Sequence, residues 1–162
     1  MIKNIKHSKK PVIDYYIFID YSVDLIGYNI IEKEKIAEIL LKIVKLGHYK
    51  KERHRRTYLA KIKKSIKKYD LMSLLYKQKI VHMKDNILIF LEVIEFIKNH
   101  DNCAIFLSVD NNQYNAFTKL LNMIPHKKHL TIVKESNLKI GSIEYRLSLI
   151  IDNMLVIERA SK

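Results

Sequence analysis

Three aspartates stand where their carboxylates could do chemistry. Asp20 and Asp110 each follow a run of apolar and β-branched residues, and Asp152 lies within the most apolar helical stretch of the chain. Open α/β sheets bind ligands beyond the carboxyl ends of their strands, so acids placed there reach a site. Neighbouring carboxylates repel each other, and a buried one needs a partner. The three acids therefore predict a site for a hard divalent cation such as Mg²⁺.

The same acids also have structural interpretations, which the sequence leaves open. An acid that follows a strand often closes a turn or caps the next helix, and this applies to Asp20 and Asp110. Asp152 could instead pair with a lysine or face solvent. The prediction of a cation site therefore rests on the three positions taken together.

Positive charge is concentrated in one segment. The formal net charge is +13, and residues 45–68 carry eleven Lys or Arg against a single acid, Glu52. Such a balance favours a polyanionic partner, nucleic acid in particular, although a lysine-rich solvated face is the alternative. The predicted nucleic-acid-binding residues are Lys50, Lys51, Arg53, Arg55, Arg56, Lys63, Lys64 and Lys67. Tyr49 and Tyr58 could stack on bases, Tyr58 being better suited to the core, and His48 and His54 are interpreted as surface residues.

Length and composition indicate one folded domain over residues 1–162. Hydrophobic residues make up 48% of the chain, which is enough to build a core. No apolar run approaches the roughly 18 residues that a membrane span needs, and the polar N-terminus lacks the apolar stretch of a signal peptide. We therefore expect a cytoplasmic protein without membrane association. The single cysteine, Cys103, is expected to be a buried hydrophobe.

Hydrophobic periodicity predicts an alternating series of strands and helices. Residues 1–11 read as a loose arm. Strands are predicted at 12–19, 25–31, 79–83, 103–110 and 129–134, the first two forming an antiparallel hairpin. Helices are predicted at 32–46, 51–69, 86–99, 112–124 and 142–159, with a further turn or two over 70–78. The fold class is therefore α/β, with parallel later strands and a basic helical insertion at 32–78.

These acids and this order resemble the ribonuclease H-like superfamily, whose elements run β-β-β-α-β-α-β-α around a mixed sheet. The resemblance implies that Asp20 is the first-strand acid, Asp110 the acid after the fourth strand and Asp152 the acid of the last helix. Glu144 is a weaker substitute for Asp152. The superfamily often adds a glutamate from the helix before the fourth strand, for which Glu92 and Glu95 are candidates. The C-terminal half also resembles an archaeal protein family of unknown function.

What the resemblance implies is hydrolysis of phosphodiester bonds in nucleic acid with two Mg²⁺ or Mn²⁺ ions. Asp20 would bridge the two ions, with Asp110 and Asp152 on either side. Two other functions remain open from the sequence. One is a PIN-like ribonuclease, in which Asp152 would have no metal-binding role. The other is a non-catalytic nucleic-acid-binding module on the same fold. An adaptor or dimer built on 32–78 is a further possibility.

Overall fold

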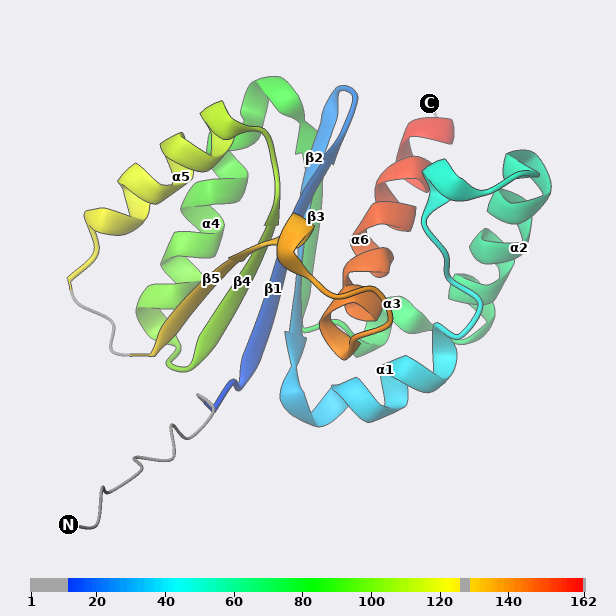
Figure 1. Ribbon diagram of the computed structural model, residues 1–162, viewed down its shortest axis with the longest axis horizontal. Helices are drawn as coiled ribbons and strands as arrows, with labels where there is room; N and C mark the ends of the chain where they lie inside the picture. The colour runs from blue at the N-terminus through cyan, green and yellow to red at the C-terminus, as the bar shows by residue number, and fades with distance from the viewer. Residues whose placement is uncertain (1–11, 126–128, 162) are drawn as a thin grey trace, which may run out of the picture.

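The computed structural model describes residues 12–125 and 129–161. The arm predicted at residues 1–11 lies outside these ranges. The described chain forms a five-stranded sheet with helices on both faces (Figure 1), so the predicted α/β class is confirmed. Across the described ranges, no helix combines the length and the apolar character that crossing a bilayer requires.

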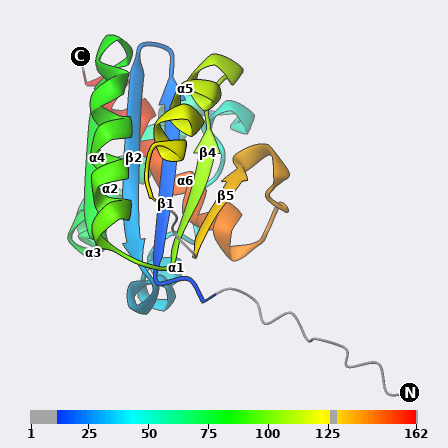
Figure 2. The same ribbon diagram turned by 90° about the vertical axis from the view of Figure 1, so that its left-hand side faces the viewer.

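The sheet is mixed, with the strand order β3-β2-β1-β4-β5. Its strands are β1 (Tyr15–Ser22), β2 (Leu25–Glu32), β3 (Lys77–His82), β4 (Cys103–Ser108) and β5 (Leu130–Lys134). β2 is antiparallel to both β1 and β3, whereas β1, β4 and β5 pair in parallel. Figure 2 shows the strands from the side of α4 and α5. The predicted hairpin and the predicted parallel strands are both confirmed.

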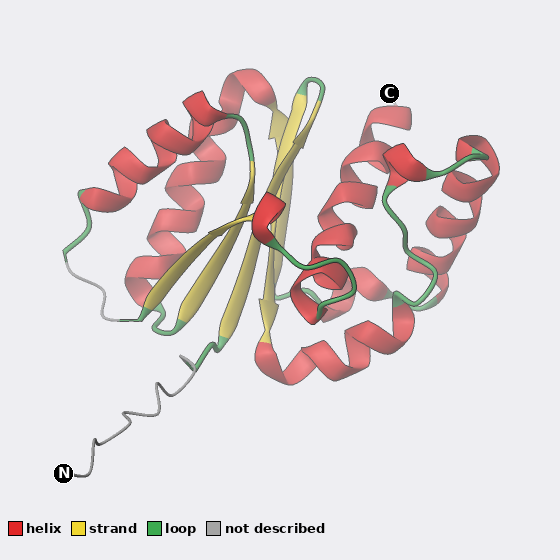
Figure 3. Cartoon of the chain, in the orientation of Figure 1, coloured by secondary structure: helices red, strands yellow, loops and turns green. Residues whose placement is uncertain are grey.

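Helices cover the two faces of the sheet unequally (Figure 3). One face carries α4 (Asn86–Asn99) and α5 (Asn111–Asn122). The other carries α1 (Ile36–Lys42), α3 (Leu71–Leu74) and α6 (Ile143–Ala160), with α2 (Arg55–Lys68) packed on α3 and α6. Because both faces are covered, the central strands are buried on both sides and read as continuous apolar runs. This explains why β1 and β4 were recognisable in the sequence.

The insertion contains shorter helices than periodicity predicted. The helix expected at 32–46 is a 3-10 turn, η1 (Lys33–Lys35), followed by the seven residues of α1. A second turn, η2 (Tyr49–Lys51), stands where the next helix was expected to begin. The stretch 70–78 holds the four-residue α3, and β3 starts within it at Lys77. Propensity alone does not locate these ends, because tertiary packing sets them.

Asn29 provides a test of how polar groups in the core affect stability. It lies in β2 with no solvent exposure, and neither its Oδ1 nor its Nδ2 has a hydrogen-bond partner among the residues that the structure describes. A buried polar group without partners costs about 1–3 kcal/mol. We therefore expect Asn29→Leu to raise the free energy of unfolding by about 1 kcal/mol or more, measured by urea denaturation. The control, Asn115→Leu, lies at an exposed position and should change the free energy of unfolding by less than about 0.5 kcal/mol. If Asn29→Leu lost stability while the control did not, the Asn29 side chain could not be an unsatisfied buried group.

Candidate functional site

A cleft of about 500 Å³ lies at the end of β1, between the sheet, α6 and the loop around η2. Its acidic lining residues come from three elements: Asp20 from β1, Asp152 from α6, and Glu135 from η4 (Glu135–Asn137), directly after β5. Its basic lining residues are His48, Lys50, Arg55 and Arg159. The cleft therefore combines carboxylates with a cationic rim.

Asp20 is the most deeply placed acid of the cleft. Asp20 is only 6% exposed to solvent. Strand β1 continues for two more residues, to Ser22. The Oδ1 of Asp20 accepts a hydrogen bond from the backbone N–H of Tyr21 at 2.7 Å, and Ser108, its register partner on β4, also hydrogen-bonds to it. None of the ion pairs found in the described residues involves Asp20.

Burial sets the protonation of this carboxyl. Desolvation raises the pKa of Asp20 well above its ordinary value, and the charges of Glu135 and Asp152 raise it further. The hydrogen bonds from Tyr21 and Ser108 act in the opposite direction and are outweighed. A bound cation would favour the ionised form of this group.

Asp152 faces the cleft from α6 beside the η2 loop. Its Oδ2 accepts a hydrogen bond from the backbone N–H of Tyr49 at 3.4 Å. Burial raises the pKa of Asp152, and nearby His48 and Lys50 oppose that shift. The structure thus brings Asp20 and Asp152 to one cleft, although they are 132 positions apart in the sequence (152 − 20).

Tyr58 fixes the loop that carries His48 and Tyr49. Its hydroxyl accepts a hydrogen bond from the Gly47 N–H at 2.8 Å. The single hydroxyl proton has two acceptors within reach, the Gly47 carbonyl at 2.9 Å and Asn153 Oδ1 at 2.8 Å. Asn153, fully buried on α6, donates from Nδ2 to the carbonyls of Gly47 and Leu149. The network holds the basic insertion against the helix that carries Asp152. The short turn η2, cyan in Figure 1, contacts this helix, α6.

Two arginines at the rim are held by neutral groups. Arg159 donates to the Ser22 hydroxyl at 3.0 Å, and Arg55 donates to the Lys50 carbonyl at 3.0 Å. The Arg55 guanidinium also lies 5.5 Å from the centre of the Tyr49 ring. Neither arginine is in an ion pair found in the described residues. Both remain able to bind an anionic ligand.

Asp110 does not line this cleft. Asp110 is exposed to solvent and is the N-cap residue of α5. Its Oδ1 accepts a hydrogen bond from the Gln113 backbone N–H at 2.8 Å. The Gln113 side chain accepts in return from the Asp110 N–H, which completes a capping box. The geometry thus gives Asp110 the structural role that the sequence had left open, and places Ser108 opposite Asp20 instead.

Replacing Asp110 separates capping from catalysis. Asp110→Ala should lower the free energy of unfolding by about 1 kcal/mol, because the cap of α5 is lost. It should leave any metal-dependent cleavage within about twofold of wild type. Thermal melting and cleavage rates measured on one preparation test both parts, and a large loss of cleavage with normal stability would restore Asp110 to the site.

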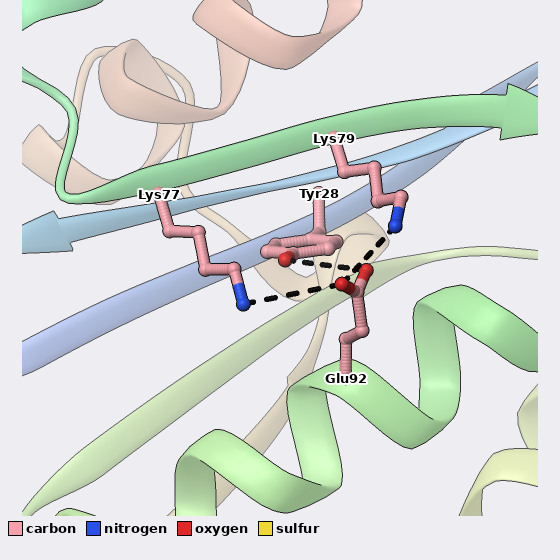
Figure 4. Close-up of polar contacts among 4 residues, drawn as sticks. All are labelled: Tyr28, Lys77, Lys79 and Glu92. Carbon is pink, nitrogen blue, oxygen red and sulfur yellow. Dashed lines mark hydrogen bonds and ion pairs between the residues drawn. The ribbon is translucent and has the colours of Figure 1, made fainter.

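The other acids suggested by the sequence also lie away from the cleft. Glu144 is in the first turn of α6, where its charge acts on Tyr16 near the beginning of β1. Glu92 faces the sheet from α4, on the opposite side from α6 (Figure 4). Its carboxylate pairs with Lys79 at 3.1 Å and Lys77 at 3.9 Å and accepts from the Tyr28 hydroxyl at 3.5 Å. Glu95, also on α4, is exposed and bonds to Asn99.

The sequence did not point to Glu135, His48 or Arg159, all of which line the cleft. Glu135 follows a parallel strand, so the rule that selected Asp20 and Asp110 could have found it. His48 was interpreted as a surface residue, but the structure places it half-buried in the cleft. Its Nδ1 is buried and has no hydrogen-bond partner within residues 12–125 and 129–161. The loop that carries it showed no periodic signal.

The predicted nucleic-acid-binding residues divide into three groups. Lys50 and Arg55 line the cleft. Lys64 lines a second groove along α2. The rest are exposed without lining either, namely Lys51, Arg53, Arg56, Lys63 and Lys67.

Carboxylate oxygens are ligands that suit a hard cation, and the cleft offers those of Asp20 and Asp152. Glu135 is close enough that its charge raises the pKa of Asp20. Within residues 12–125 and 129–161, however, no three His, Cys, Asp or Glu side chains already stand close enough together to hold a metal ion. Ion binding would therefore require side-chain movement toward a common point.

Comparison with known proteins adds no relative: no protein-family model matches the sequence, and no curated protein matches it.

Proposed function

We propose that this protein is a metal-dependent nuclease of ribonuclease H-like fold that hydrolyses phosphodiester bonds of nucleic acid. Without the insertion, its elements run β1-β2-β3-α4-β4-α5-β5-α6, the order that this resemblance implies. Asp20 on β1 and Asp152 on α6 share one cleft. Both positions correspond to acids of that superfamily.

One observation carries the proposal. Asp20 is buried at the end of a central strand, is repelled by two further carboxylates and has no ion-pair partner in the described residues. Such an arrangement is unfavourable in the absence of a cation. It is the arrangement expected where a site is built to bind a cation.

Asp20, Asp152 and Glu135 would hold the divalent ion or ions. When bound, such an ion lowers the pKa of an attacking water and stabilises charge on the leaving oxygen. Lys50, Arg55 and Arg159 bind the phosphates on either side of the scissile bond and orient the chain. The Tyr58–Asn153 network keeps the η2 loop against α6, so that these cations and Asp152 retain their relative positions.

A second candidate is a nucleic-acid-binding module without catalysis. It is favoured by the finding that the described residues hold no pre-assembled three-ligand group. It differs from the nuclease in a measurable way: Mn²⁺ or Mg²⁺ would not raise its melting temperature, whereas a carboxylate site that binds metal would be stabilised.

Cleavage of end-labelled single- and double-stranded oligonucleotides in Mg²⁺ or Mn²⁺, against EDTA, tests the proposal. Wild type should cleave only with metal, and Asp152→Asn should lose about 100-fold or more. Glu158→Gln is the matched control, since it removes one charge from an exposed position on the same helix. An Asp152→Asn variant with full metal-dependent cleavage would favour the PIN-like ribonuclease, and a wild type without any cleavage would favour the binding module.

A further inference from the structure

A second groove, also of about 500 Å³, runs along α2 outside the carboxylate cleft. Four lysines line it: Lys61, Lys64 and Lys68 from α2, and Lys45 from the loop after α1. The three helical lysines recur at spacings of three and four residues, which places them on one side of α2. None of the described residues that line this groove is acidic.

Within the part of the chain that the structure describes, no acidic side chain pairs with these lysines. All four residues are exposed, and none takes part in an ion pair found in the described residues. Like charges gathered along one groove repel each other, and a polyanion removes that repulsion. The groove therefore fits a chain of phosphates better than a neutral ligand.

Tyrosines at the groove provide surfaces for bases. Tyr69 is 42% exposed, and Lys68 Nζ lies 5.5 Å from the centre of its ring. An exposed ring flanked by cations is the arrangement on which unpaired bases stack. A base pair inside a duplex keeps its faces covered by its neighbours and cannot use such a ring.

The groove adjoins the cleft through a pair of aromatic rings. Tyr49 lines the cleft and Tyr58 lines the groove, and their ring centres are 6.5 Å apart. The hydroxyl of Tyr58 is fixed by Gly47 and Asn153, so this partition is held in place. A flexible chain that leaves the cleft over Tyr49 meets the lysines of α2 next.

We propose that this α2 groove binds an unpaired segment of the nucleic acid whose phosphodiester bond lies in the carboxylate cleft. Lys45, Lys61, Lys64 and Lys68 contact successive phosphates, and Tyr69 stacks on a base. A groove of about 500 Å³ beside the exposed Tyr69 ring suits nucleotides whose bases are unpaired, because only an unpaired base can present its face to that ring. The assignment rests on the proposed function for the identity of the polymer.

Binding is measured on the full chain in EDTA, so that the result does not depend on cleavage. Fluorescence anisotropy is recorded with single-stranded DNA, single-stranded RNA and duplex DNA of equal length, over a series of salt concentrations. The groove variant is Lys61→Gln/Lys64→Gln/Lys68→Gln. The matched control, Lys84→Gln/Lys119→Gln/Lys139→Gln, removes the same charge from exposed positions outside both cavities. Circular dichroism verifies that both variants fold.

The groove variant should weaken single-strand binding by at least tenfold and reduce the salt slope by about two, because each phosphate contact contributes about 0.7. The control should weaken it less than threefold. Tyr69→Ala should cost about tenfold for single strands without changing the slope. Equal losses in groove variant and control, or duplex affinity equal to that of single strands, would overturn the assignment. Cleavage that is absent while groove-dependent binding persists would overturn only the nuclease proposal. The DNA and RNA arms identify which polymer is preferred.

Discussion

Asp20→Asn should abolish metal-dependent cleavage and at the same time make the protein more stable at neutral pH. The Asp20 carboxyl is buried, and burial together with the charges of Glu135 and Asp152 makes its ionisation unfavourable, which raises its pKa. The amide keeps the shape of the side chain but carries no charge to desolvate. We expect the free energy of unfolding to rise by about 1–3 kcal/mol at pH 7, the usual scale of a desolvation penalty for a buried polar group, and cleavage to fall by about 100-fold.

The sign of the pH dependence follows from the direction of the pKa shift. The pKa of Asp20 is raised in the folded state, so the folded protein holds this proton more tightly than the unfolded chain. The contribution of Asp20 to stability is therefore greatest below the unfolded pKa of about 3.9. It is lost as pH rises from there through the raised folded pKa. The stability advantage of Asp20→Asn should accordingly shrink as pH is lowered.

Melting curves across pH, with and without metal, test this prediction. Mg²⁺ or Mn²⁺ should raise the melting temperature of wild type at pH 7 and have little effect on Asp20→Asn. Asp24→Asn, at an exposed position in the β1–β2 turn, is the control and should change stability by less than about 0.5 kcal/mol. Wild type and Asp20→Asn with identical melting at every pH would contradict the assigned burial and repulsion.

Gly27→Ala should be among the most damaging single changes outside the cleft. Gly27 pairs with Asp20 across the β1–β2 hairpin. A Cβ at this position would lie 2.8 Å from Ile80 Cγ1, 2.9 Å from the Lys79 carbonyl oxygen and 3.2 Å from Ile151 Cδ1. The first two contacts belong to the neighbouring strand, and the third to α6. Because the Lys79 carbonyl is backbone, it cannot move aside cheaply.

The expected loss is about 3 kcal/mol, as for overpacking in a close-packed core, with cleavage reduced at least tenfold. Activity falls because Ile151 precedes Asp152, so any outward movement of α6 takes that carboxylate away from Asp20. Gly47→Ala is the matched control: its new methyl group would come close only to the end of the flexible Glu52 side chain, with the Tyr58 hydroxyl at an ordinary contact distance of 4.0 Å. A cost below about 1 kcal/mol is therefore expected. Urea denaturation and cleavage rates measure both effects. If Gly27→Ala and Gly47→Ala were equally stable, the space between β2 and α6 would have to accommodate a methyl group, which would contradict the close contacts at Gly27.

The sequence by itself determined the elements whose signal is local. β1 and β4 are buried on both faces, so their apolar runs identified them as central strands, and α6 was evident from its length and hydrophobicity. Asp152 could be selected from the sequence, because a carboxylate within the apolar stretch 147–157 is unfavourable unless it has a partner. The concentration of positive charge at 45–68 was equally independent of the fold.

Only the tertiary structure decided which acids meet. The β1–β4 register sets Ser108 beside Asp20, which leaves Asp110 two residues further on, where it caps α5. Register depends on pairing over the whole strand, and no local pattern encodes it. Glu135 and His48 reach the cleft because the end of β5 and the docked insertion are brought there by packing, His48 through the Tyr58 and Asn153 contacts. Side chains from four separate elements can be assembled in this way only once long-range contacts have formed, which is why composition and periodicity could suggest a carboxylate site but not its full membership.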